Sequence, residues 1–358
     1  MNSSALAVEI VINNHNYGRF VGDAVQAALG QDYPHVRVIV VDDGSTDDSR
    51  DVLREYEGRI EVVLKSQGGQ ASAVNTGFER STGDVVIFLD ADDMLEKHAV
   101  SRVAAAFAAD ERVVKVQYRM QVVDGAGNPT GAYRPHVHTP LPNGDVSRAE
   151  VTFPYDLPWP GMSANAFRAD ALRKILPMPE GRQSGADWYL VHLVALLGHV
   201  GSLDEGLGSY RVHGANMYAR QHPTLDLGQV RMAVVCAAAI TPQIERLADE
   251  VGITRPPGPI LSVADLANRL VSVKLEPELH PLGVESVRSL ALNGLRAAWR
   301  RFDVAWEMKL LLAGWFLLTA VSPRPLARAM ARPFLLPEAR PRLNPLLGRL
   351  HKWNRVGG

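Results

Sequence analysis

Five aspartates lie at or just after the ends of predicted strands, in a pattern that suits a metal ion. Asp42 and Asp43 follow one apolar run, and Asp90, Asp92 and Asp93 follow another. Because Asp90 and Asp92 are two residues apart, their side chains share one face of an extended strand end. Packing several carboxylates together is costly unless a cation or hydrogen-bond donors compensate. Carboxylates with open water positions suit Mg²⁺ or Mn²⁺, and such an ion offsets the charge of a diphosphate leaving group.

The first hundred residues predict the framework that positions these carboxylates. Short, β-branched runs predict buried strands at residues 8–12, 36–41, 60–64 and 85–89. Helical stretches lie between them, at residues 20–29, 47–56 and 71–80. This alternation predicts an α/β fold with a parallel sheet, helices on both of its faces and ligands beyond the carboxyl ends of the strands. We therefore expect Asn13 and His15, which follow the first strand, to lie beside the aspartates.

The rest of the chain predicts a change of architecture near residue 222. Residues 113–139 favour strands and turns, a loop rich in proline and tryptophan follows at 154–161, and a strand is expected at 200–203. Beyond this point the pattern is helical, with breaks at the two Pro-containing pairs Pro256-Pro257 and His280-Pro281. We predict a catalytic domain at residues 1–222 and a helical domain at residues 223–358.

Four ordered motifs resemble those of family 2 glycosyltransferases. They are Asn13–Tyr17, Val41–Ser45, Gly68–Gly77 and Phe88–Asp93, and the resemblance extends over roughly Val8 to His213. It implies the GT-A fold, a nucleotide-sugar donor and transfer of the sugar with inversion. UDP-sugars are the favoured donors, with a saccharide or a lipid-linked acceptor, in the synthesis of a polysaccharide or glycolipid.

The resemblance also implies a nucleobase pocket. Asn13, His15 and Asp43 would hold the base, and Gly69 would lie along the uridine side. The family commonly has proline, threonine and tyrosine where this chain has Asn13, Asn14 and His15. A histidine can still stack on a base, but the departure leaves the identity of that base open.

The fourth motif is implied to bind the ribose and the metal. Asp90 and Asp92 would meet these groups, with Asp93 as an alternative metal contact. Asn75 and Gly77 in the third motif either bind the donor or only fix a helix against the sheet.

Inverting transfer needs a carboxylate that takes the proton of the acceptor hydroxyl. The run Gly185–Leu190 resembles the acidic motif of the family, with Ala186 in place of the usual glutamate and Asp187 kept. Asp187 is the candidate base, and its alternative role is that of a helix N-cap. The loop Trp159–Ser163 is expected to border the acceptor.

The run Ser209–Asn216 resembles the closing motif of the family. Its His213 would reach the metal or the diphosphate, and Arg211 would pair either a phosphate or a carboxylate. We interpret His136 and His138, which have no third ligand nearby, as loop residues.

The composition of the chain argues against several classes of function. A formal net charge of −1 over 358 residues argues against a general nucleic-acid binder. The single cysteine, Cys236, excludes an intramolecular disulfide and is expected to be a small buried residue. Met1–Ala7 lacks the basic and apolar segments of a secretory signal, so we expect a cytoplasmic protein.

The C-terminal segment is basic and apolar. Residues 310–321 carry no charge but are too short to span a hydrocarbon core of about 30 Å. Residues 322–358 contain one acid, Glu338, and eight basic residues, which are Arg324, Arg328, Arg332, Arg340, Arg342, Arg349, Lys352 and Arg355. This pattern favours peripheral attachment to an anionic membrane surface, such as the inner face of the cell membrane. The alternative is a helical cap or a homodimer interface.

Two other function classes compete with glycosyl transfer. A nucleotidyltransferase that makes nucleotide-sugars would share the sheet and the metal, but should carry a glycine-rich basic loop near its N-terminus. Residues 13–22 supply only Arg19 and two glycines, Gly18 and Gly22. A non-catalytic sugar-nucleotide binding scaffold should have lost the metal or base carboxylate, whereas Asp92 and Asp187 are both present.

Overall fold

The computed structural model describes residues 5–181, 185–214, 224–336, 339–340 and 342–351. The chain forms two compact units, which we treat separately. The first contains residues 1–136, 143–146 and 159–212, and the second contains residues 137–142, 147–158 and 213–358. The predicted boundary after residue 222 falls outside the described residues, so it stays a prediction.

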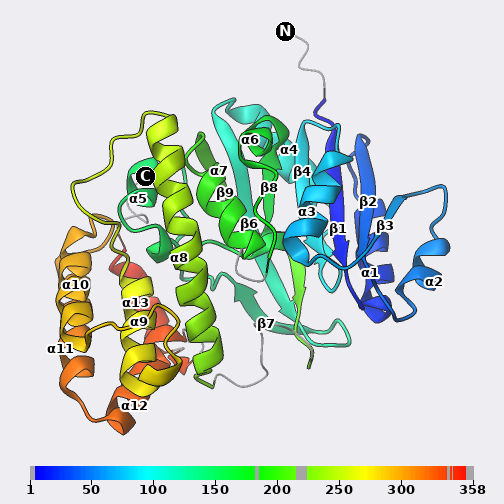
Figure 1. Ribbon diagram of the computed structural model, residues 1–358. Coiled ribbons are helices and arrows are strands. Elements are labelled where there is room, and N and C mark those ends of the chain that lie inside the picture. The colour runs from blue at the N-terminus through cyan, green and yellow to red at the C-terminus, as the bar shows by residue number, and fades with distance from the viewer. Residues whose placement is uncertain (1–4, 182–184, 215–223, 337–338, 341, 352–358) are drawn as a thin grey trace. The chain divides into compact units, whose positions relative to one another are not determined.

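Within the described residues, one sheet of nine strands runs through the first unit, in the order β3-β2-β1-β4-β8-β6-β9-β5, with β7 paired to β6 (Figure 1). The strands are β1 (Val8–Asn14), β2 (Val36–Asp43), β3 (Glu61–Lys65), β4 (Val85–Asp90), β5 (Met94–Leu95), β6 (Val113–Val123), β7 (Pro129–Arg134), β8 (Asn165–Arg168) and β9 (His199–Arg211). The four strands β3, β2, β1 and β4 are parallel, as predicted, and β8 lies antiparallel to β4. Strands β1, β2 and β4 extend beyond the apolar runs, so several candidate residues are the last residues of strands.

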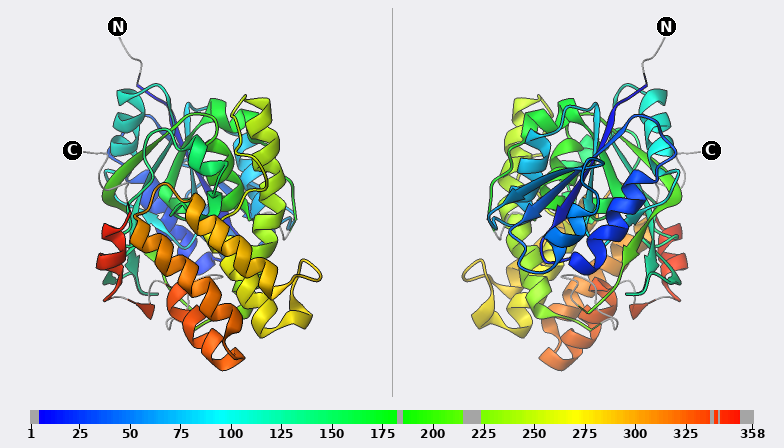
Figure 2. Two further views of the ribbon diagram at one scale, coloured as in Figure 1. Left: turned by 90° about the vertical axis from the view of Figure 1, so that its left-hand side faces the viewer. Right: turned by 90° about the vertical axis from the view of Figure 1, so that its right-hand side faces the viewer.

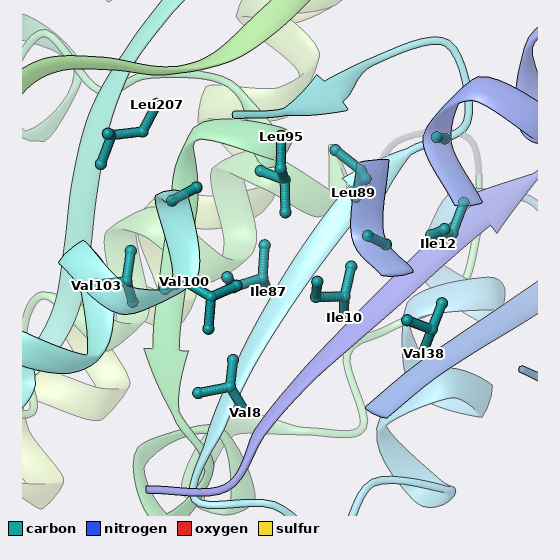
Figure 3. Close-up of a cluster of buried hydrophobic side chains, with 14 of the residues drawn as sticks. Val8, Ile10, Ile12, Val38, Ile87, Leu89, Leu95, Val100, Val103 and Leu207 are labelled. Atoms are coloured by element: carbon teal, nitrogen blue, oxygen red, sulfur yellow. The ribbon is translucent and has the colours of Figure 1, made fainter. Parts of the chain in front are cut away.

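Helices cover both faces of the parallel strands. Alternate residues of β1 point to opposite faces. Ile10 and Ile12 lie in one apolar cluster with Val38, Ile87, Leu89, Val100 and Val103 (Figure 3). Val11, on the other face, lies against Gly77 of α3, where an added Cβ would stand 2.3 Å from the Val11 Cγ1. The helices of this unit are α1 (Gly18–Leu29), α2 (Ser49–Arg54), α3 (Gln70–Glu79), α4 (Ala99–Ala109), η2 (Met162–Ala164), α6 (Ala169–Ile175) and α7 (Ala186–Val194).

The predicted start of the second helix is wrong. The sequence predicts a helix from residue 47, but α2 begins at Ser49 with Asp48 at the N-cap. The Ser45 Oγ accepts hydrogen bonds from the Asn14 side chain and the Asn16 backbone N–H. Contacts between the first two βα loops therefore fix the residues that precede α2.

The second unit is helical in its long C-terminal part, as predicted. Its elements are α5 (Ser147–Glu150), η1 (Pro154–Asp156), α8 (Leu227–Glu250), α9 (Val263–Leu275), η3 (Pro277–Leu279), α10 (Val287–Arg300), α11 (Trp306–Val321), α12 (Arg324–Leu335) and α13 (Asn344–Arg349). Phe316 of α11 is fully buried in a cluster with Leu270 of α9 and Ala297 of α10. Cys236 is buried in α8, as expected.

Helix α8 is long and apolar enough to cross a membrane, judged by its length and composition alone. The core helix of a soluble protein passes the same test, and nine residues of α8 are buried in the structure. The helix is therefore weak evidence for a membrane span.

Candidate active site

Strand register brings the candidate residues to one edge of the sheet. Asn13 is the register partner of Asp90, and Asn14 is that of Asp42. Asp43 is in turn paired with Lys65 of β3. The carboxyl ends of the three parallel strands β1, β2 and β4 thus carry side chains that the sequence selected, where an open α/β sheet binds its ligands.

Asp43 organises the loop before α3. Its carboxylate accepts hydrogen bonds from the Lys65 Nζ at 2.7 Å and from the backbone N–H groups of Gly68 and Gly69 at 2.9 and 2.7 Å. Gly69 has a φ of +86°, which favours glycine, and a Cβ there would have nothing within 4 Å. Asp43 therefore shapes an open backbone surface beside the strand ends.

Asp42 is a structural residue, although it was counted among the five carboxylates. It points to the opposite face from Asp43 and is fully buried. Burial raises the pKa of its carboxyl, but hydrogen bonds from Ser45, Asn14 and Arg50 outweigh burial and hold it below the usual range. These bonds tie β1, β2 and the start of α2 together.

Asn13 and His15, which are predicted to hold the nucleobase, lie at the end of β1 and directly after it. The His15 Nδ1 is 2.8 Å from the Asp43 carbonyl oxygen, and its Nε2 is 3.0 Å from the Gln67 side-chain nitrogen. Both polar side-chain atoms of Asn13 are buried, and neither has a hydrogen-bond partner among the described residues. A buried amide in this state leaves a donor and an acceptor for a ligand.

The aspartates after β4 form a cluster with a surplus of negative charge. The Asp90 side chain accepts a hydrogen bond from the Gln70 Nε2 at 2.9 Å, and its backbone N–H donates to the Ser163 Oγ at 3.0 Å. Burial, repulsion by Asp92 and repulsion by Asp187 raise the pKa of Asp90 to about 7. Asp187 of α7 therefore contributes to the electrostatics of the strand-end cluster.

The effect of this charge extends to neighbouring groups. Burial and the charges of Asp92 and Asp90 raise the pKa of Asp93 well above its usual range. Burial and the same three aspartates raise the pKa of Tyr17 to about 12. Such mutual repulsion is relieved by a bound cation.

The donor set fits a Mg²⁺ or Mn²⁺ ion. No group of three or more His, Cys, Asp or Glu side chains in the described part of the chain is arranged to hold a metal by itself. These ions take one or two protein carboxylates and complete their shell with waters and substrate phosphates. Asp92 and Asp93 are therefore suitable ligands, and the roles assigned to them stay predictions. His213 lies in the other unit, so its role is also a prediction.

Arg211 holds the turn that carries Asp92 and Asp93. Its backbone N–H donates to the Asp93 carboxylate at 3.1 Å, and its Nε donates to the Asp92 carbonyl oxygen at 3.1 Å. The guanidinium also pairs with Asp23 of α1 at 2.7 Å and lies over the ring of Phe20. The sequence predicts that Arg211 pairs with either a phosphate or a carboxylate. The structure shows the pairing with the Asp23 carboxylate, and the contact of Arg211 with the donor stays a prediction.

Asp187 lies in the first turn of α7, and the N-cap is Gly185. The alternative reading of Asp187 as the N-cap is therefore wrong. Burial raises the pKa of its carboxyl, against a hydrogen bond from the Trp188 backbone N–H and the charge of His192. The ring of His192 contacts the rings of both Trp159 and Trp188 edge-on. Asp187 thus has an aromatic neighbourhood, and Trp159 belongs to the loop predicted to border the acceptor.

Sequence reasoning missed four residues that support the cluster, namely Tyr17, Lys65, Gln70 and Ser163. Tyr17 and Gln70 stand inside the motifs already recognised, so their positions carried a usable signal. Lys65 follows from strand pairing, since it is the register partner of Asp43. Ser163 reaches Asp90 through a tertiary contact across 73 residues, which no local pattern encodes.

The sheet order, the strand-end aspartates and the helical C-terminal part define a GT-A fold. Residues 9–176 match the model of glycosyl transferase family 2, so this segment of the chain is a glycosyltransferase domain of that family. It is similar to an uncharacterised glycosyltransferase of Nostoc sp., with 33% identity over 218 residues that cover 59% of this chain and 66% of the relative. It is also similar to the teichuronic acid biosynthesis glycosyltransferase TuaG of Bacillus subtilis, with 39% identity over 99 residues that cover 26% of this chain and 39% of the relative. The matched segments thus span less than two thirds of either relative.

Solved structures share the fold at low sequence identity. Staphylococcus aureus TarS 1–349 in complex with UDP-GlcNAc aligns with a TM-score of 0.53 and 15% identity, over 94% of this chain and 92% of that one. The mannosyltransferase PcManGT of Pyrobaculum calidifontis in complex with GDP-Man and Mn²⁺ aligns with a TM-score of 0.50 and 16% identity, over 99% of this chain and 87% of that one. These likenesses support the fold alone.

Proposed function

We propose that the protein is an inverting, metal-dependent glycosyltransferase that moves a sugar from a nucleotide-diphosphate-sugar to an acceptor hydroxyl. One observation carries the proposal. The buried amide of Asn13, which has no partner among the described residues, is in register with Asp90. A polar group for a nucleobase thus adjoins a carboxylate cluster suited to a metal-bound diphosphate, in a family 2 domain.

The donor nucleotide lies along the carboxyl ends of β1, β2 and β4 in this proposal. The amide of Asn13 pairs with the base edge, and the ring of His15 stacks against it. Asp43 keeps the loop at Gly69 open beside the uridine, through the three hydrogen bonds it accepts. A UDP-sugar is the favoured donor, and a hexosyl group is the favoured group for transfer.

The ribose and the diphosphate belong at the aspartate cluster. Asp90 meets the ribose, and Asp92 holds Mg²⁺ or Mn²⁺, with Asp93 and His213 as further candidate ligands. A divalent ion at this position supplies charge neutralisation of the departing diphosphate. Arg211 keeps the Asp92 carbonyl in place through its Nε, and its guanidinium is the candidate contact to the donor.

Asp187 acts as the general base. Its carboxylate takes the proton of the acceptor hydroxyl while the hydroxyl oxygen bonds to the anomeric carbon and the bond to the diphosphate breaks. The raised pKa of the Asp187 carboxyl supports this role, because a stronger base accepts a proton more readily. Trp159 and Trp188 offer apolar surface beside Asp187 for the acceptor.

The acceptor is a saccharide or a lipid-linked saccharide in a polysaccharide or glycolipid pathway. The relative TuaG, which is described as an enzyme of teichuronic acid biosynthesis, supports this class. We place the enzyme in the cytoplasm, at the inner face of the cell membrane, where a lipid-linked acceptor is found. A homodimer is the alternative role for the C-terminal segment.

A donor screen tests the proposal. The full chain is incubated with UDP-, GDP- and dTDP-sugars, with and without Mn²⁺, while thermal stability and donor hydrolysis are measured. One nucleotide class should raise the melting temperature with Mn²⁺ present, because a ligand of the native state stabilises it. Asp92→Asn should remove the metal dependence and turnover, whereas the exposed control Asp32→Asn should retain both. If no nucleotide-sugar stabilises the protein, or if Asp92→Asn turns over normally, the proposal fails.

A further inference from the structure

Helix α11 presents an apolar face to solvent. Six large side chains are exposed on this helix, among them Trp306 at 63% and Val321 at 80%. At 100° per residue all six fall on one arc of about 140°, which also contains Gly314 and, in the first turn of the helix, the exposed Glu307. The six are Trp306, Leu310, Leu311, Leu317, Leu318 and Val321, and they are called the α11 face below.

The opposite side of the same helix is already used for packing. Met308, Ala313, Phe316 and Thr319 are buried. Phe316 lies in the cluster formed with α9 and α10, and the ring of Trp315 stacks on that of Phe334 of α12. The fold of this unit therefore accounts for one side of α11 and leaves the α11 face without a protein partner among the described residues. Figure 2 shows α11 beside α10 and α12 in the orange part of the chain.

Positive charge follows the α11 face along the chain. Arg324, Arg328 and Arg332 of α12 are exposed and recur every four residues, so they lie along one side of that helix. Only Ser322 and Pro323 separate Val321 from Arg324. Between residues 287 and 335, Glu307 is the one exposed acid, against five exposed arginines that also include Arg288 and Arg296.

We propose that the α11 face docks on an anionic membrane surface, with its apolar side chains at the level of the headgroups and the arginines of α12 beside the phosphates. An apolar arc bordered by cations is the pattern of interfacial helices. A second copy of the chain fits less well, because the five exposed arginines would be brought toward their own copies. At sixteen residues α11 is too short to span a bilayer, so the contact is peripheral.

The test uses the full chain and vesicles of phosphatidylcholine with or without one quarter phosphatidylglycerol. Co-sedimentation should appear with the anionic vesicles only and weaken when salt is raised from 0.1 to 0.5 M, by screening. Arg324→Gln with Arg328→Gln should lower the partition coefficient about thirtyfold, given the usual contribution of a basic residue near such a surface. Leu310→Ser with Leu317→Ser should lower it by at least as much.

Matched controls separate docking from folding. Leu279 and Val284 are also exposed, at 55% and 107%, but lie outside the α11 face. Leu279→Ser with Val284→Ser should therefore bind vesicles like the wild type, and all variants should keep its melting temperature and its donor stabilisation. Equal binding to neutral vesicles, or wild-type binding by the α11-face variants, would overturn the proposal. So would a dimer that dissociates in the Leu310→Ser and Leu317→Ser variant while vesicle binding is unchanged.

Discussion

Without divalent metal, the folded protein should lose stability between about pH 4 and pH 7 because of Asp90. The pKa of this carboxyl is raised to about 7 in the folded state, from 3.8, by burial and by repulsion from Asp92 and Asp187. The folded state therefore keeps a proton that the unfolded chain has released near pH 4. Because the folded state binds more protons in this interval, the free energy of unfolding falls as pH rises. The contribution is complete below pH 4 and lost above pH 7.

The size of the effect follows from the two pKa values. Their difference of about three pH units, at about 1.4 kcal/mol each, sets an upper limit of about 4 kcal/mol. Asp90 is partly exposed, and water screens part of the repulsion. We therefore expect Asp90→Asn to be about 2 kcal/mol more stable than the wild type at pH 8. The two proteins should differ little at pH 4.

Chemical denaturation at several pH values in EDTA measures this difference. The control is Asp32→Asn, which changes an exposed aspartate outside the cluster and should keep the wild-type slope. Adding Mn²⁺ at pH 8 should stabilise the wild type more than Asp90→Asn, because the ion relieves a repulsion that the variant lacks. Parallel pH profiles for wild type and Asp90→Asn in EDTA would refute the reasoning, and so would a wild type that Mn²⁺ leaves unchanged.

Three further changes test the base, the packing and the Asp92 turn. Asp187→Asn should lower kcat at least a hundredfold with donor affinity nearly unchanged, measured by steady-state kinetics and donor titration; an equal loss of donor affinity would place Asp187 in the donor pocket. Gly77→Ala should destabilise the protein by about 1–2 kcal/mol in urea, because the new Cβ would lie 2.3 Å from the Val11 Cγ1; unchanged stability would contradict this packing. Arg211→Lys keeps the positive charge but loses the guanidinium Nε–H that donates to the Asp92 carbonyl. The Mn²⁺ concentration for half-maximal activity should therefore rise about tenfold. An unchanged value would show that this hydrogen bond is dispensable.

The sequence could predict the parallel core because its signals are local. Apolar runs are bounded by glycine or polar residues. The run at residues 85–89, for example, coincides with β4 except for the last residue of that strand, Asp90. The ends of the strands were harder to predict, because Asp90 continues β4 although its side chain is polar. It is held there by pairing with Asn13 of β1, a contact across 77 residues that periodicity does not reveal.

The candidate site was predictable as a set of residue types, but not as a set of contacts. The spacing of Asp90 and Asp92 indicated a metal, and the structure adds the repulsion that such an ion would relieve. The pairing of Arg211 with Asp23 and with the Asp92 carbonyl depends on the position of β9 beside β5 and β6. Long-range strand order, and not the local sequence, decides which groups Arg211 meets.

The two ends of the candidate site differ in how their charge is balanced. This difference bears on the order in which the metal and the donor bind. At the end proposed for the nucleobase, the Asp43 carboxylate is paired with the Lys65 ammonium and two backbone N–H groups. At the end proposed for the diphosphate, the Gln70 side-chain amide donates to Asp90 and the Arg211 backbone N–H donates to Asp93, and the pKa values of both carboxyls are raised. A nucleobase can therefore bind beside a carboxylate that is already paired, whereas a diphosphate arriving alone would add negative charge to a cluster whose carboxyl pKa values are already raised. The cation that relieves the cluster also attracts the diphosphate. We therefore expect the affinities for metal and donor to be coupled, with each ligand raising the affinity for the other by the same factor.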